Sequence, residues 1–268
     1  MESIRMRGVP WLFAFVVSVF LQCCATAQQL PGAPVSMASA SGQAVLTQAL
    51  HRAAAEGRLD ALVAMLKQGM EVDMADTSQR TPLMTASAHG HIEVVEELIR
   101  RDADVNRTQV DGATALFMAA GRGSDDICLT LLHAGADVNQ SSTDGYTPLM
   151  MAVMEGNESA ALVLLEDGAE VDAINRVGVT SLMVAAMEGN AEMTEMLMDA
   201  GARADIAAQS GKTALMLAAQ RGYQDVVRTL CERGANILAR TTTGVTARDL
   251  AVAAGHDNIL PLLEGFVK

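Results

Sequence analysis

The stretch TPLMMAVMEG, residues 147–156, returns 33 residues later as TSLMVAAMEG, residues 180–189. Both copies begin with threonine, carry leucine at the third place and end with glycine. A stretch that returns at a fixed spacing of this size indicates a chain built from stacked copies of one structural unit.

The same spacing holds along most of the chain. Threonine stands at every 33rd residue, with leucine two residues after all but the last, and these threonines are Thr81, Thr114, Thr147, Thr180, Thr213 and Thr246. Three glycine series keep the same period, with Gln79 and Asp102 at two places where glycine is expected. The unit is therefore repeated six or seven times.

Each recurring residue has a local role in a pair of helices. A threonine hydroxyl can accept a hydrogen bond from an unpaired amide at a helix start, and proline fits the first helical turn. Leu149, Ala152 and Val153 then share one face of the helix. Gly156 ends it, because glycine adopts a left-handed cap at little cost. A second helix follows in each unit, and turn-forming residues such as 143–146 join the units.

A 33-residue helix-turn-helix-hairpin unit with Thr-Pro-Leu, an alanine pair, Gly-His and Gly-Ala-Asp-Val-Asn resembles the ankyrin repeat. The resemblance implies an all-α fold, an ankyrin-repeat solenoid of about seven such units with hairpin tips at one edge and a concave face. It also implies a role in binding other proteins and no catalysis. The ankyrin-repeat domain is expected over residues 43–268, with repeats at about 43–75, 76–108, 109–141, 142–174, 175–207, 208–240 and 241–268.

The sequence departs from the family pattern at one position of most units. The histidine that usually follows the Thr-Pro-Leu leucine is kept only as His51, and apolar residues replace it at Met84, Phe117, Met150, Met183 and Met216. Packing must substitute there for the hydrogen bond of the histidine. The last unit has Asp249 at this position and Pro261 early in its second helix, where amides are unpaired, and we expect it to cap the C-terminal end.

The first 27 residues have the composition of a secretory signal peptide. Arg5 and Arg7 precede an apolar run from Trp11 to Leu21, and small residues up to Ala27 resemble a cleavage site. The apolar run has eleven residues, fewer than the roughly twenty that a membrane-spanning helix needs. We therefore expect cleavage near Ala27, no stable membrane insertion afterwards, and a periplasmic or secreted protein.

Residues 28–42 are rich in Pro, Ala, Ser and Gly and are expected to form a flexible linker. Lipid attachment at Cys23 or Cys24 is a minor alternative, because no small residue precedes the first of these cysteines.

The chain is acidic, and its charge limits the possible ligands. Without residues 1–27 it has 31 acidic residues and 17 Lys or Arg. Phosphate backbones are bound by clustered basic side chains, so we expect no nucleic acid ligand. The balance favours a protein partner with a basic surface.

No arrangement of residues predicts catalysis or a cofactor. The segment 211–213, Gly-Lys-Thr, lacks the earlier glycine of a phosphate-binding loop, and the repeat itself explains its glycine and threonine. A zinc site at His89, His91 and Glu93 has no further ligand at a recognised spacing.

Five other residues that could carry chemistry have structural explanations. Cys128 and Cys231 lie three repeats apart, roughly 25 to 30 Å, which is too far for a disulfide, so we predict two buried free thiols. Glycosylation sequons begin at Asn106, Asn139 and Asn157. The first two asparagines belong to the repeat pattern, which favours a structural role.

Methionine fits two different roles in the middle of the chain. Met150 and Met183 fall between adjacent repeats, where flexible thioethers fill gaps. Met154 and Met187 fall on positions that the family leaves open on the concave face. We predict a partner-binding strip there, apolar with an acidic rim, formed by Tyr146, Met154, Glu155, Val179, Met187 and Glu188.

Charge patterning supports this strip. Residues 143–199 contain eleven acids and one base, and residues 203–248 contain seven bases and three acids. A basic, partly apolar partner would be steered to repeats 4 and 5. For Glu155 and Glu188, simple solvation of an exposed helix is an equally good explanation.

Two further functions remain as alternatives. Thioethers suit Cu(I), and fifteen methionines follow residue 27, so a methionine-rich metal-handling protein is the alternative to a binding module. A hydrolase would require a deep pocket with convergent polar groups. Capped ends favour a monomer.

Overall fold

The computed structural model describes residues 40–266, and this part of the chain is helical and contains no strand. One compact unit starts at Gln43. The predicted signal peptide and residues 28–39 of the predicted linker lie outside the described residues. Helix α2 (Ala40–Ala55) is described from Ala40, three residues before the predicted start of the repeat domain.

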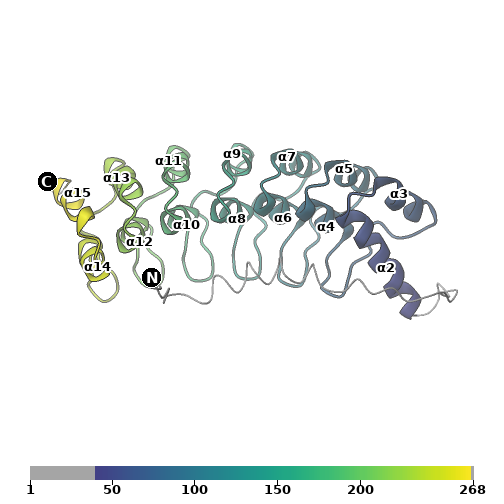
Figure 1. Cartoon of the computed structure of the whole chain (residues 1–268), viewed down its shortest axis with the longest axis horizontal. Helices are drawn as coiled ribbons and strands as arrows, with labels where there is room; N and C mark the ends of the chain where they lie inside the picture. Colours follow the sequence, from purple (N-terminus) through teal and green to yellow (C-terminus); the bar gives the residue numbers. More distant parts are fainter. Residues whose placement is uncertain (1–39, 267–268) are drawn as a thin grey trace, which may run out of the picture. The chain divides into compact units, whose positions relative to one another are not determined.

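Two rows of helices make up the repeat domain, as Figure 1 shows. The inner row lies next to the hairpin loops and consists of α2, α4 (Pro82–His89), α6 (Ala115–Arg122), α8 (Pro148–Met154), α10 (Ser181–Glu188), α12 (Ala214–Arg221) and α14 (Ala247–Ala254). The outer row consists of α3 (Leu59–Lys67), α5 (Ile92–Arg100), α7 (Asp125–His133), α9 (Glu158–Glu166), α11 (Ala191–Asp199), α13 (Gln224–Glu232) and, after the short 3-10 helix η1 (Asp257–Ile259), α15 (Leu260–Gly265). From α4 onward, each inner helix packs against the next one.

The threonines start the inner helices as predicted. In α8, the Met150 amide donates to the Thr147 hydroxyl at 3.2 Å, and the other five threonines of the series accept the equivalent bond. Glycines in the left-handed conformation cap α4, α6, α10, α12 and α14, as at Gly189 with φ 76°. Helix α8 instead ends at Met154 with Glu155 as its cap, one residue before Gly156. The predicted all-α repeat architecture is confirmed.

The second repeat keeps its turns without two of the usual glycines. Gln79 and Asp102 adopt φ values of 61° and 62°, so the backbone stays left-handed where the sequence departs from the pattern. The Gln79 amide still donates to the Asp76 carbonyl at 2.9 Å. The repeat geometry therefore overrides the local preference of these residues for negative φ.

Neighbouring hairpin tips are joined by single backbone hydrogen bonds. The Arg176 amide donates to the Asp144 carbonyl at 2.9 Å, and the Gln209 amide donates to the Val177 carbonyl at 3.1 Å. Gly145 permits this approach, because a Cβ atom there would lie 2.9 Å from the Cα of Asn175. The tips of successive repeats are thus held in register.

A second series of bonds joins the loops that follow the outer helices. The side chains of Asn106 and Asn139 accept from the amides of Asp137 and Glu170, each at 2.8 Å. Asn157 donates from its side-chain amide to the carbonyls of repeat 3 at 3.0 Å. All three sequon asparagines therefore have a structural role between repeats.

Apolar packing replaces the family histidine between repeats. Met84, Met150, Met183 and Met216 are each at most 1% exposed. His51 keeps its polar role, with Nδ1 3.0 Å from Thr85 Oγ1 and Nε2 2.9 Å from the carbonyl oxygen of Met74. Burial lowers the pKa of His51, which keeps its ring neutral.

The last repeat differs from the others in its first turn. Asp249 accepts from the Thr246 amide at 2.9 Å, while the Thr246 hydroxyl accepts from the Asp249 amide at 3.3 Å, and the two residues form a capping box. Pro261 lies in the first turn of α15, where no helical bond is lost.

Candidate functional site

The six predicted binding residues lie at the two ends of two neighbouring inner helices. Met154 and Glu155 end α8, and Met187 and Glu188 end α10. Tyr146 and Val179 each lie one residue before the threonine that starts one of these helices. The length of the helix, about 10 Å, separates each of them from the methionine and glutamate of its own repeat. The candidate site therefore has two parts.

The glutamates form the charged part of the site. Glu155 and Glu188 are exposed and occupy the same position of adjacent helices. Partial desolvation of its carboxyl group raises the pKa of Glu155, and the negative charge of Glu188 raises it further. Within residues 40–266, no basic side chain forms an ion pair with either glutamate. The two like charges therefore lie close together without compensation.

Arginines occupy the same position in the two flanking repeats. Arg122 ends α6 and Arg221 ends α12, and both are exposed. The ends of four successive inner helices thus carry the charges plus, minus, minus, plus. Of these, only the arginines suit the negative end of a helix dipole.

Apolar side chains form the floor beside this row of charges. Met154 and Met187 are half-buried and pack against the core. Met151, which sequence reasoning did not select, is also half-buried, and its Cε would lie 3.1 Å from a Cβ placed on Gly121 of the preceding repeat. Its spacing of three residues from Met154 was the signal that could have found it.

The hairpin tip of repeat 5 adds a second apolar surface. Ile174 and Val177 are 57% and 54% exposed. Beside them, Arg176 lies 3.9 Å from the Asp144 carboxylate of the preceding tip. Sequence reasoning selected only Val179 from this tip, and exposed apolar side chains at a turn were the missed signal.

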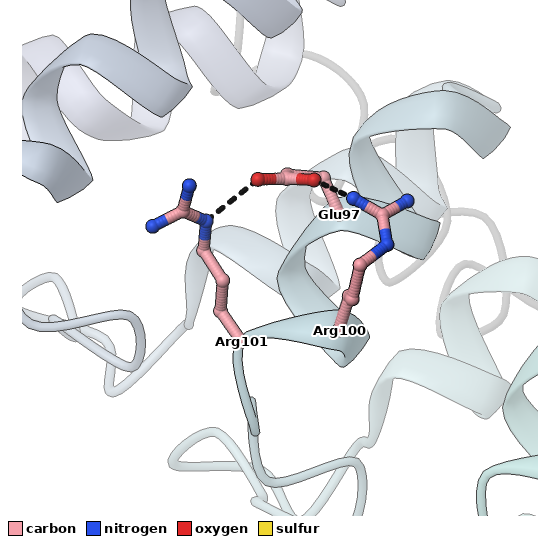
Figure 2. Close-up of polar contacts among 3 residues, drawn as sticks. All are labelled: Glu97, Arg100 and Arg101. Carbon is pink, nitrogen blue, oxygen red and sulfur yellow. Dashed lines mark hydrogen bonds and ion pairs between the residues drawn. The ribbon is translucent and has the colours of Figure 1, made fainter.

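On the outer row, some acidic side chains have basic partners. Glu97 of α5 is 8% exposed, and its two carboxylate oxygens bind Arg100 and Arg101. Figure 2 shows the carboxylate between the two guanidinium groups. Arg233, which follows α13 in repeat 6, bridges Glu195 and Asp199 of α11 in repeat 5. These acids have a basic partner within ion-pair distance, in contrast to Glu155 and Glu188.

Comparison with known proteins agrees with this architecture. The family model of ankyrin repeats (three copies) matches residues 30–109, 50–142, 104–175 and 182–265. The chain belongs to the ankyrin-repeat family. Among solved structures it is similar to the human ASB11 ankyrin repeat domain, with 31% sequence identity, a TM-score of 0.74, and coverage of 81% of this chain and 97% of that one. No curated protein matches the chain.

Membership of this family fixes the general function. Ankyrin repeats are protein–protein interaction modules and typically non-enzymatic scaffolds. Among residues 40–266, no helix is both long and apolar enough to span a bilayer. The same residues contain no group of three or more His, Cys, Asp and Glu side chains placed to hold a metal ion.

Both cysteines of the ankyrin-repeat domain are buried free thiols, as predicted. Burial raises the pKa of Cys128 to about 12, with a smaller effect from Asp125. Burial and Glu232 raise the pKa of Cys231 to about 11. Both thiols therefore stay protonated at neutral pH and are poor nucleophiles.

Proposed function

We propose that this ankyrin-repeat protein is an exported, monomeric interaction module. It binds a partner protein through the concave face and the hairpin tips of repeats 4 and 5. The partner carries a basic, partly apolar surface. The binding residues are the six predicted from the sequence, joined by Met151 on the floor of the site.

The observation that carries this proposal is the uncompensated pair Glu155 and Glu188. Two like charges at the ends of adjacent helices repel each other, and the helix dipole opposes both. Neither effect helps the chain to fold. A basic group of a partner placed between them would relieve the repulsion, and the half-buried thioethers of Met154 and Met187 would accept the apolar part of the same partner.

Export and the monomeric state rest on the sequence. The composition of residues 1–27 supports a signal peptide, and the net negative charge supports a basic partner outside the cytoplasm or in the periplasm. The last repeat departs from the family pattern at Asp249 and Pro261, which supports a C-terminal capping repeat.

A crosslinking capture experiment tests the proposed site. Residues 28–268 and a Met154→Asp, Met187→Asp variant are compared as baits in the exported fraction of the native cells. A matched control carries Leu129→Asp and Leu162→Asp, because these residues are 40% and 46% exposed at equivalent positions of the outer helices α7 and α9.

We expect one protein to be captured by the unchanged bait and by the outer-row control, but not by the Met154→Asp, Met187→Asp variant. All three baits must show the same melting temperature, so that loss of capture reports on binding and not on folding. Equal capture by all three baits would place the binding site elsewhere on the repeats.

A further inference from the structure

The charges at the ends of the inner helices form an ordered row. Arg122, Glu155, Glu188 and Arg221 occupy the same position of α6, α8, α10 and α12, and each of these helices packs against the next. None of the four side chains forms an ion pair within the described part of the chain. Packed helices lie about 8 to 10 Å apart, which sets the spacing of the charges.

This spacing matches one regular conformation of a narrow ligand. A polyproline II segment has three residues per turn and rises about 3.1 Å per residue, so every third side chain points the same way at intervals of about 9 Å. In a β-strand, residues three apart point to opposite faces. The described residues contain no strand, so these helices offer no strand edge, and a partner must be recognised through side chains and not by added strand pairing.

We propose that the partner segment is an extended, polyproline II-like peptide that crosses inner helices α6 to α12 with the charge order acid-x-x-base-x-x-base-x-x-acid. This inference rests on the proposed function and specifies the ligand of the same site. The two basic side chains lie opposite Glu155 and Glu188, and the outer acids lie opposite Arg122 and Arg221. Apolar residues between them contact Met154 and Met187.

The location of the row favours a narrow ligand over a helical one. All four charges stand at the last residue or the cap of their helices, at one edge of the inner row. A helical ligand is about 10 to 12 Å wide, as wide as these short helices are long, and would need about 22 residues to span the row with seven-residue spacing. An extended segment spans it with about ten residues.

The test measures the affinity of labelled peptides for the full chain by fluorescence anisotropy. The probe EPLKPLKPLE carries the proposed order, and the control KPLEPLEPLK has the same composition with the order inverted. A helical peptide with the same four charges at seven-residue spacing is a third probe. The protein variant Arg122→Glu, Glu155→Arg, Glu188→Arg, Arg221→Glu inverts the row while keeping its net charge.

We expect the unchanged protein to bind the first peptide at least about ten-fold more tightly than the inverted one, and the inverted protein to show the opposite preference. Equal affinities, tighter binding of the helical probe, or no binding of the first peptide up to about 1 mM would overturn the inference. If the inverted protein variant has a different melting temperature from the unchanged protein, the double variant Glu155→Gln, Glu188→Gln takes its place. This double variant must bind the two peptides with equal affinity.

The two proposals fail in different ways. In one outcome, the Met154→Asp, Met187→Asp bait loses the partner while the protein binds both peptide charge orders equally. That result would support the binding site and contradict the proposed ligand. Equal capture by all baits would remove the site itself.

Discussion

Two groups of acidic residues, one on each row of this solenoid, have different surroundings. On the outer row, Glu97 is enclosed by two arginines, and Glu195 and Asp199 share Arg233. On the inner row, Glu155 and Glu188 lie side by side, and the pKa of Glu155 is raised by desolvation and by its neighbour. These outer-row acids thus have basic partners, whereas the two inner-row glutamates are like charges without one.

Under the proposed function, this difference separates side chains that stabilise the fold from side chains that bind the partner. Natural sequences are locally consistent with their fold except at functional sites. The paired acids stabilise the fold through their ion pairs. The inner glutamates of repeats 4 and 5 repel each other and oppose the helix dipole. The inner surface of these repeats is therefore where the chain departs from what stability favours.

The largest expected effect distinguishes core from surface within α8. Met150 is fully buried and Met154 is half-buried, four residues apart on one helix. Met150→Ala should lower the free energy of unfolding by about 2 to 5 kcal/mol through a cavity. Met154→Ala should cost less than about 1 kcal/mol. Urea unfolding of both variants measures the difference, and equal losses would mean that Met154 belongs to the core.

Removing a paired acid from the outer row should have the next largest effect. Glu97→Gln leaves the Arg100 and Arg101 guanidinium groups without their carboxylate, at a cost of about 1.5 to 3 kcal/mol for lost charged hydrogen bonds. Glu96→Gln, on the exposed face of the same helix, is the matched control. Equal free energies of unfolding for Glu97→Gln and Glu96→Gln would show that the Glu97 ion pairs do not stabilise the fold.

Removing the inner glutamates should have the opposite sign. Glu155→Gln with Glu188→Gln relieves the repulsion and the conflict with the helix dipole, so the free energy of unfolding should rise by about 0.5 kcal/mol, a small value because solvent screens exposed charges. The effect should shrink in high salt. A loss of stability in low-salt urea titrations would contradict the contrast between the rows.

The smallest expected effect is a pH dependence of this stabilisation. The pKa of Glu155 is higher in the folded chain than its ordinary value of 4.5. The folded state therefore binds this proton more tightly, and the contribution of Glu155 to stability is greatest below that value and is lost as the pH rises through the raised pKa. The advantage of Glu155→Gln over the unchanged protein should be largest at pH 7 and disappear towards pH 4. A constant difference would contradict the origin given for the shift.

The sequence predicted most of the fold because the period and the local chemistry agree. Threonine, proline and glycine specify where each inner helix starts and ends, whatever lies around them. Gln79 and Asp102 could not be decided in the same way, since only the neighbouring repeats hold their backbone left-handed. The first residues of α2, from Ala40, fall in the segment predicted as a linker, because small residues suit both a linker and a helix start.

The candidate site was predictable only in part. The period placed Glu155 and Glu188 at the same position of adjacent helices. Whether a basic side chain reaches either glutamate depends on the three-dimensional packing and could not be read from the period. The Glu97 pair was visible from its spacing to Arg100 and Arg101 and was not selected. The exposure of Ile174 and Val177 at their tip follows from the hairpin geometry and not from residue type.

Site-directed photocrosslinking tests the central claim most directly. A photoreactive phenylalanine analogue replaces Met154 in one protein and Leu162, on the outer helix of the same repeat, in another. With the partner that the capture experiment identifies, we expect a crosslink from position 154 and none from position 162. Crosslinking from position 162 alone, or equally from both, would contradict binding on the inner face of repeats 4 and 5.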